Sequence, residues 1–326
     1  MIVRPKATWL RMVFMLRGST LAKTWPRLLM VAAVAEGVTY THEKYGWFHT
    51  NLTLVPFTLI GLALGIFLGF RNNTSYDRFW EGRKLWGRVV NTSRSLTRQM
   101  LTLVGPAEGV SADYRTTAKG DGAPEEVAAV HKALVYRVIA YVHSLRLHLR
   151  TQDRLKELAP FLSEDELKEL EPEQNRPIAL LQRIGAELRA LYDKGWIHTM
   201  HLPVLEASLT EFANVQGGCE RIKATPIPFS YNILLHRIVF VYCFTLPFGL
   251  VTLEGVGDYT PIIVLLVSYA FFGLDAVGDE IENPFGEDPN DLPLNAITRM
   301  IEGNLRQRLG ETELPEPVKP KRFVLT

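Results

Sequence analysis

Residues 45–70 read YGWFHTNLTLVPFTLIGLALGIFLGF, without a single Asp, Glu, Lys or Arg. A helix needs about 20 predominantly apolar residues to cross the hydrocarbon core of a bilayer. Trp47 and Phe48 stand at one end of this segment, and aromatic residues are typical of the membrane interface. The length and the lack of charge predict a transmembrane helix that reaches Phe70.

Three other segments are apolar but shorter or interrupted by charge. They are residues 27–42, 237–254 and 259–274. A span that is slightly short can still cross a membrane when a charged residue at its end snorkels to the interface or faces protein. The spacing predicts two hairpins of membrane helices, over residues 27–70 and 230–277, on either side of a polar middle region.

The basic residues predict the orientation of these hairpins. The turn inside the first hairpin contains only Lys44, and the sequence EGVGDY inside the second contains no Lys or Arg. Basic residues instead precede the first span and follow the second, namely Arg4, Lys6, Arg11, Arg17, Lys23, Arg27, Arg71, Arg78, Arg83, Lys84 and Arg88. The positive-inside rule then places both termini and the middle region in the cytosol. We expect a multi-pass protein of the cell membrane.

The rest of the chain is predicted to be helical, with no strand pairs and no internal repeat. The second membrane helix continues into the cytosol as far as Gly105-Pro106, which ends it. Further helices are expected at residues 127–154, 163–170, 177–193 and 201–222. Outside the two membrane hairpins, the predicted segments are an interfacial or cytosolic stretch over 1–26, a cytosolic helical region over 71–229, an acidic loop and helix over 278–310, and a disordered tail over 311–326.

The composition excludes several classes of protein. With 36 basic and 35 acidic residues, the chain lacks the positive charge that nucleic-acid binding requires. Cys219 and Cys243 are the only two cysteines, too few for a disulfide framework or a cysteine-based zinc site. No GxSxG, P-loop, HExxH or dinucleotide-binding motif is present.

Two stripes of residues repeat every four positions between residues 59 and 70. One is Gly61, Gly65 and Gly69, and the other is Leu62, Ile66 and Phe70. Small residues at this spacing let membrane helices approach closely, so the glycines are candidate helix-packing residues. The apolar stripe has two interpretations. It faces lipid or a neighbouring helix, or it lines a narrow apolar constriction shared by several copies of the chain.

Two other groups of side chains could bind a metal ion. The segment 275–295, DAVGDEIENPFGEDPNDLPLN, offers the oxygen ligands that Ca²⁺ prefers, although it lacks the EF-hand spacing and also fits a solvated acidic loop. His198 and His201 lie three positions apart and could place two imidazoles on one face for zinc. No third ligand is evident beside them.

Three blocks of sequence resemble one family. They are RNNTSYDRFWEGRKLWGRVVN at 71–91, TPIPFSY at 225–231 and ENPFGEDPND at 282–291. These blocks resemble the signature segments of the bestrophins in their bacterial form. The resemblance implies an all-α membrane protein with four transmembrane helices per subunit, a large cytosolic helical region, and a homopentamer around a single axial pore. It further implies that Leu62, Ile66 and Phe70 line the apolar neck of that pore.

The resemblance also implies two further sites. A second constriction at the cytosolic exit would be formed by Leu180, or failing that by Ile178. The Ca²⁺ clasp of the animal members would match Asn283 and Glu287 through carbonyl oxygens and Asp288 and Asp291 through carboxylates. This chain differs from the animal pattern by placing Pro289 and Asn290 inside the acidic run, so we expect no required cofactor and weak Ca²⁺ dependence.

The functional expectation is a passive ion channel, with membrane lipid, small ions and other copies of the chain as its partners. The family implies conduction of chloride and other anions, while its bacterial branch includes channels that prefer cations such as sodium. Two alternatives remain at this stage. One is a membrane-bound metalloenzyme that uses the acidic loop and histidines, and the other is a membrane scaffold that transports nothing.

Overall fold

The computed structural model describes residues 1–3, 8–15, 18–47, 53–106, 124–253 and 255–326. Within them the chain is mainly helical, and the isolated β-bridges between two described residues join Val104 with Ile197 and Lys321 with Val324. The α-helices are α1 (Trp9–Val13), α2 (Leu21–Tyr45), α3 (Val55–Leu103), α4 (Pro124–Leu149), α5 (Glu164–Leu170), α6 (Arg176–Asp193), α7 (Leu202–Ala224), α8 (Phe229–Leu250), α9 (Thr260–Glu282) and α10 (Leu294–Arg308), and two 3-10 helices are η1 (Leu155–Leu158) and η2 (Gly257–Tyr259). The prediction of an all-α chain is confirmed for these residues.

The chain forms two compact units, and we name them by the surfaces they present. The apolar unit consists of Ile2–Trp80 and Thr225–Pro284. The polar unit consists of Met1, Glu81–Ala224 and Phe285–Thr326. Helix α3 contributes its first half to the apolar unit and its second half to the polar unit. The division within α3 falls after Trp80. The predicted end of the membrane span at Phe70 is a separate boundary and stays a prediction.

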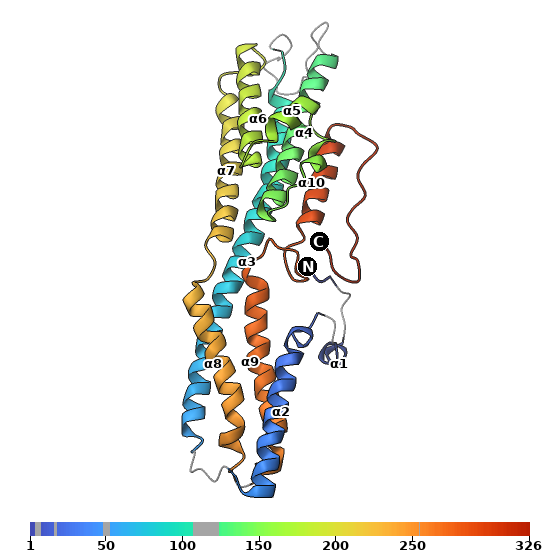
Figure 1. Cartoon of the computed structure of the whole chain (residues 1–326). Coiled ribbons are helices and arrows are strands. Elements are labelled where there is room, and N and C mark those ends of the chain that lie inside the picture. The colour runs from blue at the N-terminus through green and yellow to red at the C-terminus, as the bar shows by residue number, and fades with distance from the viewer. Residues whose placement is uncertain (4–7, 16–17, 48–52, 107–123, 254) are drawn as a thin grey trace. The chain divides into compact units, whose positions relative to one another are not determined.

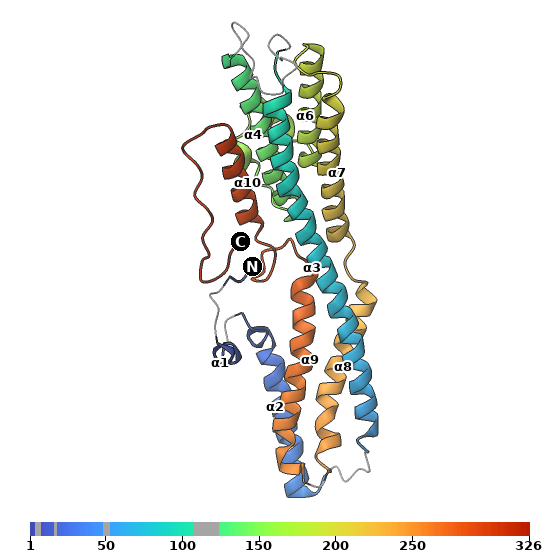
Figure 2. The same cartoon turned by 180° about the vertical axis from the view of Figure 1, so that it is seen from behind.

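The apolar unit is a bundle of α2, α8, α9 and the first half of α3 (Figures 1 and 2). Its core is made almost entirely of aliphatic and aromatic side chains from all four helices, among them Val31, Leu64, Val239 and Val264. Three helices of the described chain are long and apolar enough to cross a membrane, namely α3, α8 and the segment Gly257–Glu282. Helix α2 has 25 residues but is interrupted by charge, so its membrane span remains a prediction.

The polar unit is built around α4. One side of this helix packs on α6 and another on α10, and its side chains from Leu134 to Leu145 are nearly all buried. Tyr141 donates a hydrogen bond to the carbonyl of Phe212 on α7 at 3.0 Å. Such a helix, surrounded on several sides, forms the hydrophobic core that its neighbours cover.

Several helix ends follow from the sequence. Helix α3 ends at Leu103, just before Gly105-Pro106. Ser163 and Glu166 form the capping box that the sequence SEDE predicts at the start of α5. Helix α4 stops at Leu149, earlier than the predicted end at residue 154, and Thr151 adopts a positive φ of 54°. That conformation is incompatible with a continuing right-handed helix.

The tail after Gly310 differs from the prediction of a disordered segment. The backbone N–H of Ala296 on α10 donates to the Thr326 carbonyl at 2.8 Å, and the Leu325 N–H donates to the Met1 carbonyl at 2.8 Å. Arg306 donates to the Glu313 carbonyl at 3.0 Å. The tail is rich in proline and low in hydrophobic residues, so its packing depends on polar contacts that a composition-based prediction does not detect.

Candidate functional site

The stripe formed by Leu62, Ile66 and Phe70 lies on the surface of α3. The three residues are 66%, 50% and 60% exposed. Leu64 and Leu68, which are buried in the core of the apolar unit, are each offset from stripe residues by two positions. At 100° per residue, two positions turn a helix by about 200°. The stripe therefore points almost directly away from the bundle of its own subunit.

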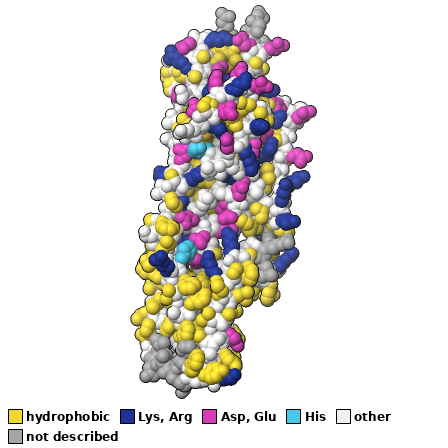
Figure 3. All heavy atoms as spheres, viewed as in Figure 1, with side chains coloured by type: hydrophobic (Ala, Val, Ile, Leu, Met, Phe, Trp, Pro, Cys, Tyr) yellow, Lys and Arg dark blue, Asp and Glu magenta, His cyan; other side chains and the backbone are white. Residues whose placement is uncertain are grey.

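An exposed apolar surface of this kind needs a partner. Hydrophobic side chains cover much of the visible surface of the apolar unit, whereas Lys, Arg, Asp and Glu are spread over the polar unit (Figure 3). Contiguous exposed apolar patches mark contact with membrane or with another protein. The stripe carries no charge, so a passage lined by it would resist water and ions through its narrowness and its poor wetting.

The glycine stripe beside it is only partly used within one chain. A Cβ on Gly61 would lie 2.6 Å from the hydroxyl oxygen of Tyr242 on α8, so glycine is required for this close approach. Among the described residues, nothing lies within 4 Å of a Cβ built on Gly65 or Gly69. These two positions stay predictions for helix packing.

A buried ionic cluster lies directly after the stripe. The Arg71 side chain is 0% exposed, and its Nη1 donates to Asp275 Oδ1 at 2.6 Å while Nη2 donates to Asp279. His236 Nδ1 lies 3.0 Å from Asp275, and Arg27 Nη1 lies 3.4 Å from it. A buried charge is tolerated only when it is paired and hydrogen-bonded. The cluster therefore joins α2, α3, α8 and α9 one residue beyond the stripe.

Close backbone packing accompanies this cluster. Asn72 Nδ2 donates to the Leu274 carbonyl at 3.0 Å, and a Cβ on Gly278 would collide with Asn72 Oδ1. Glycine at position 278 leaves room for the Asn72 side chain between α3 and α9. The cluster and this contact together fix the rotation and height of α3 in the bundle, and hence the direction of the stripe.

The three sequence blocks that resemble the bestrophins meet in the apolar unit. Arg78 Nε donates to the Glu282 carbonyl at 3.0 Å, and its Nη1 donates to the Thr225 carbonyl. The Glu282 carboxylate accepts from the Ile227 N–H at 3.0 Å and from Asn232 Nδ2 at 3.3 Å. Segments about 150 and 200 residues apart thus share one hydrogen-bonded junction. This shared junction explains why the three blocks together are typical of one fold.

From the sequence, Asp275 and Asp279 are expected in an acidic loop, with no pairing to Arg71. The structure places both on α9, four positions apart, which puts them on one face of the helix. The signal that could have found the pair is a charged i, i+4 doublet at the end of an apolar run, because charges at such a position require partners.

His236, Asp275 and Asp279 also form a group with ligand atoms within 4.8 Å of one another, the one group of three or more such residues found in the described part of the chain. Arg71 already donates to both carboxylates, so a metal ion would compete with the guanidinium. His198 and His201, the predicted zinc pair, have ring centroids 5.5 Å apart, and no such three-residue group of described residues contains them.

The structure separates the two residues proposed for the cytosolic constriction. Leu180 on α6 is 0% exposed and belongs to the core of the polar unit, whereas Ile178 is 40% exposed. A side chain buried within its own subunit cannot line a passage between subunits. Burial therefore favours Ile178 over Leu180, and the constriction itself stays a prediction.

The residues of the predicted Ca²⁺ clasp are divided between the two units. Asn283 belongs to the apolar unit, and Glu287, Asp288 and Asp291 belong to the polar unit. Asp291 is 3% exposed, and its Oδ2 accepts a hydrogen bond from the Asp288 N–H at 2.7 Å. One carboxylate oxygen of the clasp is thus engaged by the loop's own backbone.

Glu287 is engaged as well. Its carboxylate accepts a hydrogen bond from Gln152 at 2.9 Å and lies 3.6 Å from Arg150 Nη1. Burial lowers the pKa of the Arg150 guanidinium, and the charge of Glu287 opposes that shift. The cationic Arg150 beside the loop reduces the attraction of this site for a divalent ion.

Known proteins share the sequence of this chain over nearly its whole length. Residues 1–307 match the family described as Bacterial/Fungal Bestrophin protein. The chain belongs to the bestrophin family. It is 38% identical to the voltage-dependent anion channel-forming protein RSc3414 of Ralstonia nicotianae, over 100% of both chains. It is 37% identical to the voltage-dependent anion channel-forming protein YneE of Escherichia coli strain K12, over 99% of this chain and 98% of that protein.

Solved structures agree with the fold of this bestrophin. The crystal structure of a bacterial bestrophin homolog from Klebsiella pneumoniae, obtained by Zn-SAD phasing, matches with a TM-score of 0.77 and 33% sequence identity. The match covers 88% of this chain and 98% of that one. A variant of the Klebsiella pneumoniae protein with the D179A mutation matches with a TM-score of 0.78 and 34% identity, over 89% and 100% of the two chains. The predicted family and the all-α membrane fold are confirmed.

Proposed function

We propose that this bestrophin is an ion-channel subunit, and that five copies place α3 around one axial pore whose neck is lined by Leu62, Ile66 and Phe70. The observation that carries the proposal is the exposed apolar stripe on the side of α3 opposite its own bundle. Its relatives over the full length are named as anion channel-forming proteins. The chain is therefore a channel-forming protein rather than a metalloenzyme.

The proposed mechanism is passive conduction. An ion entering the neck loses part of its hydration, because the apolar side chains offer no replacement ligands. The barrier then depends on the width of the neck and on whether it is wetted. The Arg71 cluster acts as a positioning element, since it fixes the direction in which the stripe points without touching the ion.

The conducted ions are small monovalent ions, and the names of the relatives favour anions. A neck of Leu, Ile and Phe has no charge and cannot choose the sign of an ion by direct coordination. Selectivity then depends on charged groups outside the neck. Reversal potentials in asymmetric chloride or sodium gradients distinguish the two signs.

The membrane arrangement that goes with this pore has four spans per subunit. Helix α2 is proposed as the first span, because it packs on α8 and α9 and its residues Leu28, Val31 and Ala35 join their core. Both termini and the polar unit are proposed to lie in the cytosol, as the distribution of Lys and Arg favours. Ile178 is proposed as the second constriction, on the cytosolic side.

The test compares two triple variants of the purified protein in planar bilayers. Leu62→Ala/Ile66→Ala/Phe70→Ala should raise single-channel conductance at least about twofold, because a wider and better-wetted neck lowers the barrier. The matched control is Phe240→Ala/Val241→Ala/Leu266→Ala, whose side chains are 53%, 55% and 65% exposed on α8 and α9. We expect its conductance to equal that of the wild type.

Three results would contradict the proposal. They are an unchanged current in the correctly assembled neck variant, an equal change in both variants, and a solubilised protein that is monomeric. The non-transporting scaffold is tested in the same experiment, because it predicts no ion flux from liposomes that contain the wild type.

A further inference from the structure

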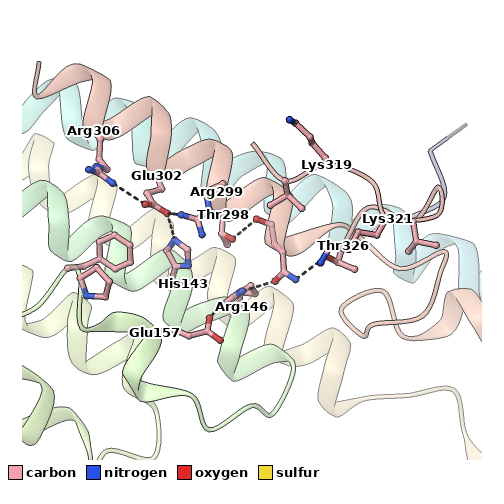
Figure 4. Close-up of a pocket in the computed structure, with 15 residues that line it drawn as sticks. His143, Arg146, Glu157, Thr298, Arg299, Glu302, Arg306, Lys319, Lys321 and Thr326 are labelled. Carbon is pink, nitrogen blue, oxygen red and sulfur yellow. Dashed lines mark hydrogen bonds and ion pairs between the residues drawn. The ribbon is translucent and has the colours of Figure 1, made fainter. Parts of the chain in front are cut away.

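A cavity of about 790 Å³ lies within the polar unit, between α4, α10 and the C-terminal tail. Its volume falls in the range of small-molecule binding sites. Its wall includes His143 and Arg146 of α4, Arg299 of α10, and Lys319 and Lys321 of the tail (Figure 4). Channel conduction as proposed above uses none of these residues.

The face of α10 that lines the cavity is polar, although it is turned toward the protein. Asn295, Thr298, Arg299, Glu302 and Arg306 all line it, at the three- and four-residue spacing of one helix face. Thr298 and Glu302 are 1% and 2% exposed. A helix that packs on a core normally presents apolar residues at such positions, so this polar face indicates a site.

The buried acid at the base of the cavity holds basic groups in place. Glu302 accepts from His143 Nε2 at 3.2 Å and from Arg299 Nη1 at 3.1 Å, and it lies 3.5 Å from Arg306 Nη1. Burial raises the pKa of Glu302, but the His143 hydrogen bond and the charges of Arg299 and Arg306 outweigh it and hold that pKa below the usual value. The acid therefore stays ionised and keeps the two guanidinium groups oriented.

The cavity carries an excess of positive charge. Five cationic side chains line it, against the side-chain carboxylates of Glu157 and Glu302 and the terminal carboxylate of Thr326. Arg146 pairs with Glu157, and Arg306 pairs with Glu311 at 2.6 Å. Lys319 and Lys321 form no ion pair with the residues that the structure describes. The two lysines on the tail side are thus outside the ion pairs of the described residues.

One buried donor also lacks an acceptor. Arg146 is 8% exposed, and its Nε has no hydrogen-bond partner among the described residues, while its Nη1 donates to Asn295 at 2.7 Å. A buried polar atom without a partner costs free energy, and it is usual at a site that awaits a ligand. A ligand oxygen would satisfy this donor.

We propose that this cavity binds a small phosphate-bearing anion between α10 and the tail. Phosphate oxygens accept hydrogen bonds. They can accept two parallel bonds from an Arg guanidinium and can also pair with the compact positive charge of a Lys ammonium. Phe161, Val318 and Val324 form an apolar part of the lining, which suits the carbon portion of an organic phosphate. Because the ligand contacts both α10 and the tail, it fastens the tail in place.

The test is titration of the solubilised full-length protein with inorganic pyrophosphate by isothermal calorimetry at about physiological ionic strength. The wild type should bind saturably, and Lys319→Gln/Lys321→Gln should bind at least about tenfold more weakly. The matched control is Lys156→Gln/Lys168→Gln, two exposed lysines outside the cavity. Its affinity should stay within about twofold of the wild type, because it removes the same net charge elsewhere.

A second readout follows the tail itself. Pyrophosphate should slow cleavage after Glu313, which precedes Leu314, by a glutamate-specific protease in the wild type and the control, but not in the Lys319/Lys321 variant. Absence of saturable binding would overturn the proposal, and so would equal weakening in both double variants. Binding of citrate without binding of pyrophosphate would overturn the phosphate assignment. None of these results depends on ion conduction.

Discussion

The two units of this bestrophin differ in the side chains that they expose. In the apolar unit the apolar stripe Leu62, Ile66 and Phe70 is at the surface, while Arg71 and Asp275 are buried. In the polar unit the aliphatic side chains of α4 are buried, and pairs such as Arg189–Asp193 are at the surface. The surface composition of each unit reflects its surroundings. A charged side chain buried in the apolar unit marks a position where the orientation of a helix must be fixed.

The largest effect is expected from breaking the buried cluster. Arg71→Gln leaves Asp275 short of its buried counter-charge, and loss of one partner of a buried ion pair costs about 3–5 kcal/mol. We expect a much lower yield of assembled protein and a markedly lower thermal midpoint, measured on the detergent-solubilised oligomer by size-exclusion chromatography and differential scanning fluorimetry.

The control for this variant comes from the polar unit. The side chains of Arg189 and Asp193 are 66% and 54% exposed, and exposed pairs contribute little to stability. Arg189→Gln should leave yield and thermal midpoint unchanged. Equal losses in both variants would show that burial does not distinguish the ion pairs of the two units.

The second effect concerns the face of α3 that carries the stripe. At 100° per residue, Asp77 returns to this face seven residues after Phe70, and it is exposed. In the proposed pentamer it would form an acidic ring next to the apolar neck. Such a ring opposes anion entry, so Asp77→Asn should raise anion over cation permeability about two- to tenfold.

Reversal potentials in asymmetric chloride solutions measure this change. Asp165, an exposed acid of the polar unit, supplies the control variant Asp165→Asn, for which we expect the wild-type reversal potential. A shift of the same size in both variants would remove the assignment of Asp77 to the pore axis.

A smaller effect is expected from Ca²⁺. Pro289 and Asn290 interrupt the acidic run, and Arg150 lies 3.6 Å from Glu287, so the loop offers fewer free carboxylates than a sensor site needs. Open probability in planar bilayers should change by less than about twofold between a chelator and Ca²⁺ at sensor concentrations of about 10⁻⁶ M. A steep rise with Ca²⁺ that Asp291→Asn abolishes would contradict this expectation.

The sequence predicts the local features well, because their causes are local. The membrane-spanning character of α3 follows from the missing charges of its first part, the end of α3 from Gly105-Pro106, and the start of α5 from the capping box of Ser163 and Glu166. Each of these depends on residues within a few positions of one another.

The features that were missed depend on distant partners or on helix phase. Arg71 pairs with Asp275 across 204 positions of sequence, and no spacing rule links them. Leu180 and Ile178 lie two positions apart on α6, so they point about 200° apart. Choosing between them requires knowledge of which side of α6 faces the core, and that is set by α4 and α7.

The smallest effect is a pH dependence confined to the polar unit. His131 lies in α4, and its Nε2 is 2.8 Å from the Val104 carbonyl. Burial lowers the pKa of His131, and its hydrogen bond to the Val104 carbonyl opposes that shift only in part. The unfolded chain therefore takes up a proton at a higher pH than the folded chain does. This contribution to stability is complete above about pH 6.5, the ordinary value for histidine, and is lost as the pH falls through the lowered pKa.

We expect the thermal midpoint of the solubilised protein to decrease as the pH falls from 7.5 to 5.5, with part of the decrease due to this group. In His131→Gln an amide can donate to the same carbonyl but does not titrate, so that part of the decrease should disappear. The control is Arg189→Gln, which keeps His131. Its thermal midpoint should decrease with falling pH as much as that of the wild type. If the thermal midpoint of His131→Gln decreases with falling pH as much as that of the wild type, other groups cause the decrease. Protonation of the buried His131 would then have no measurable effect on the stability of the folded protein.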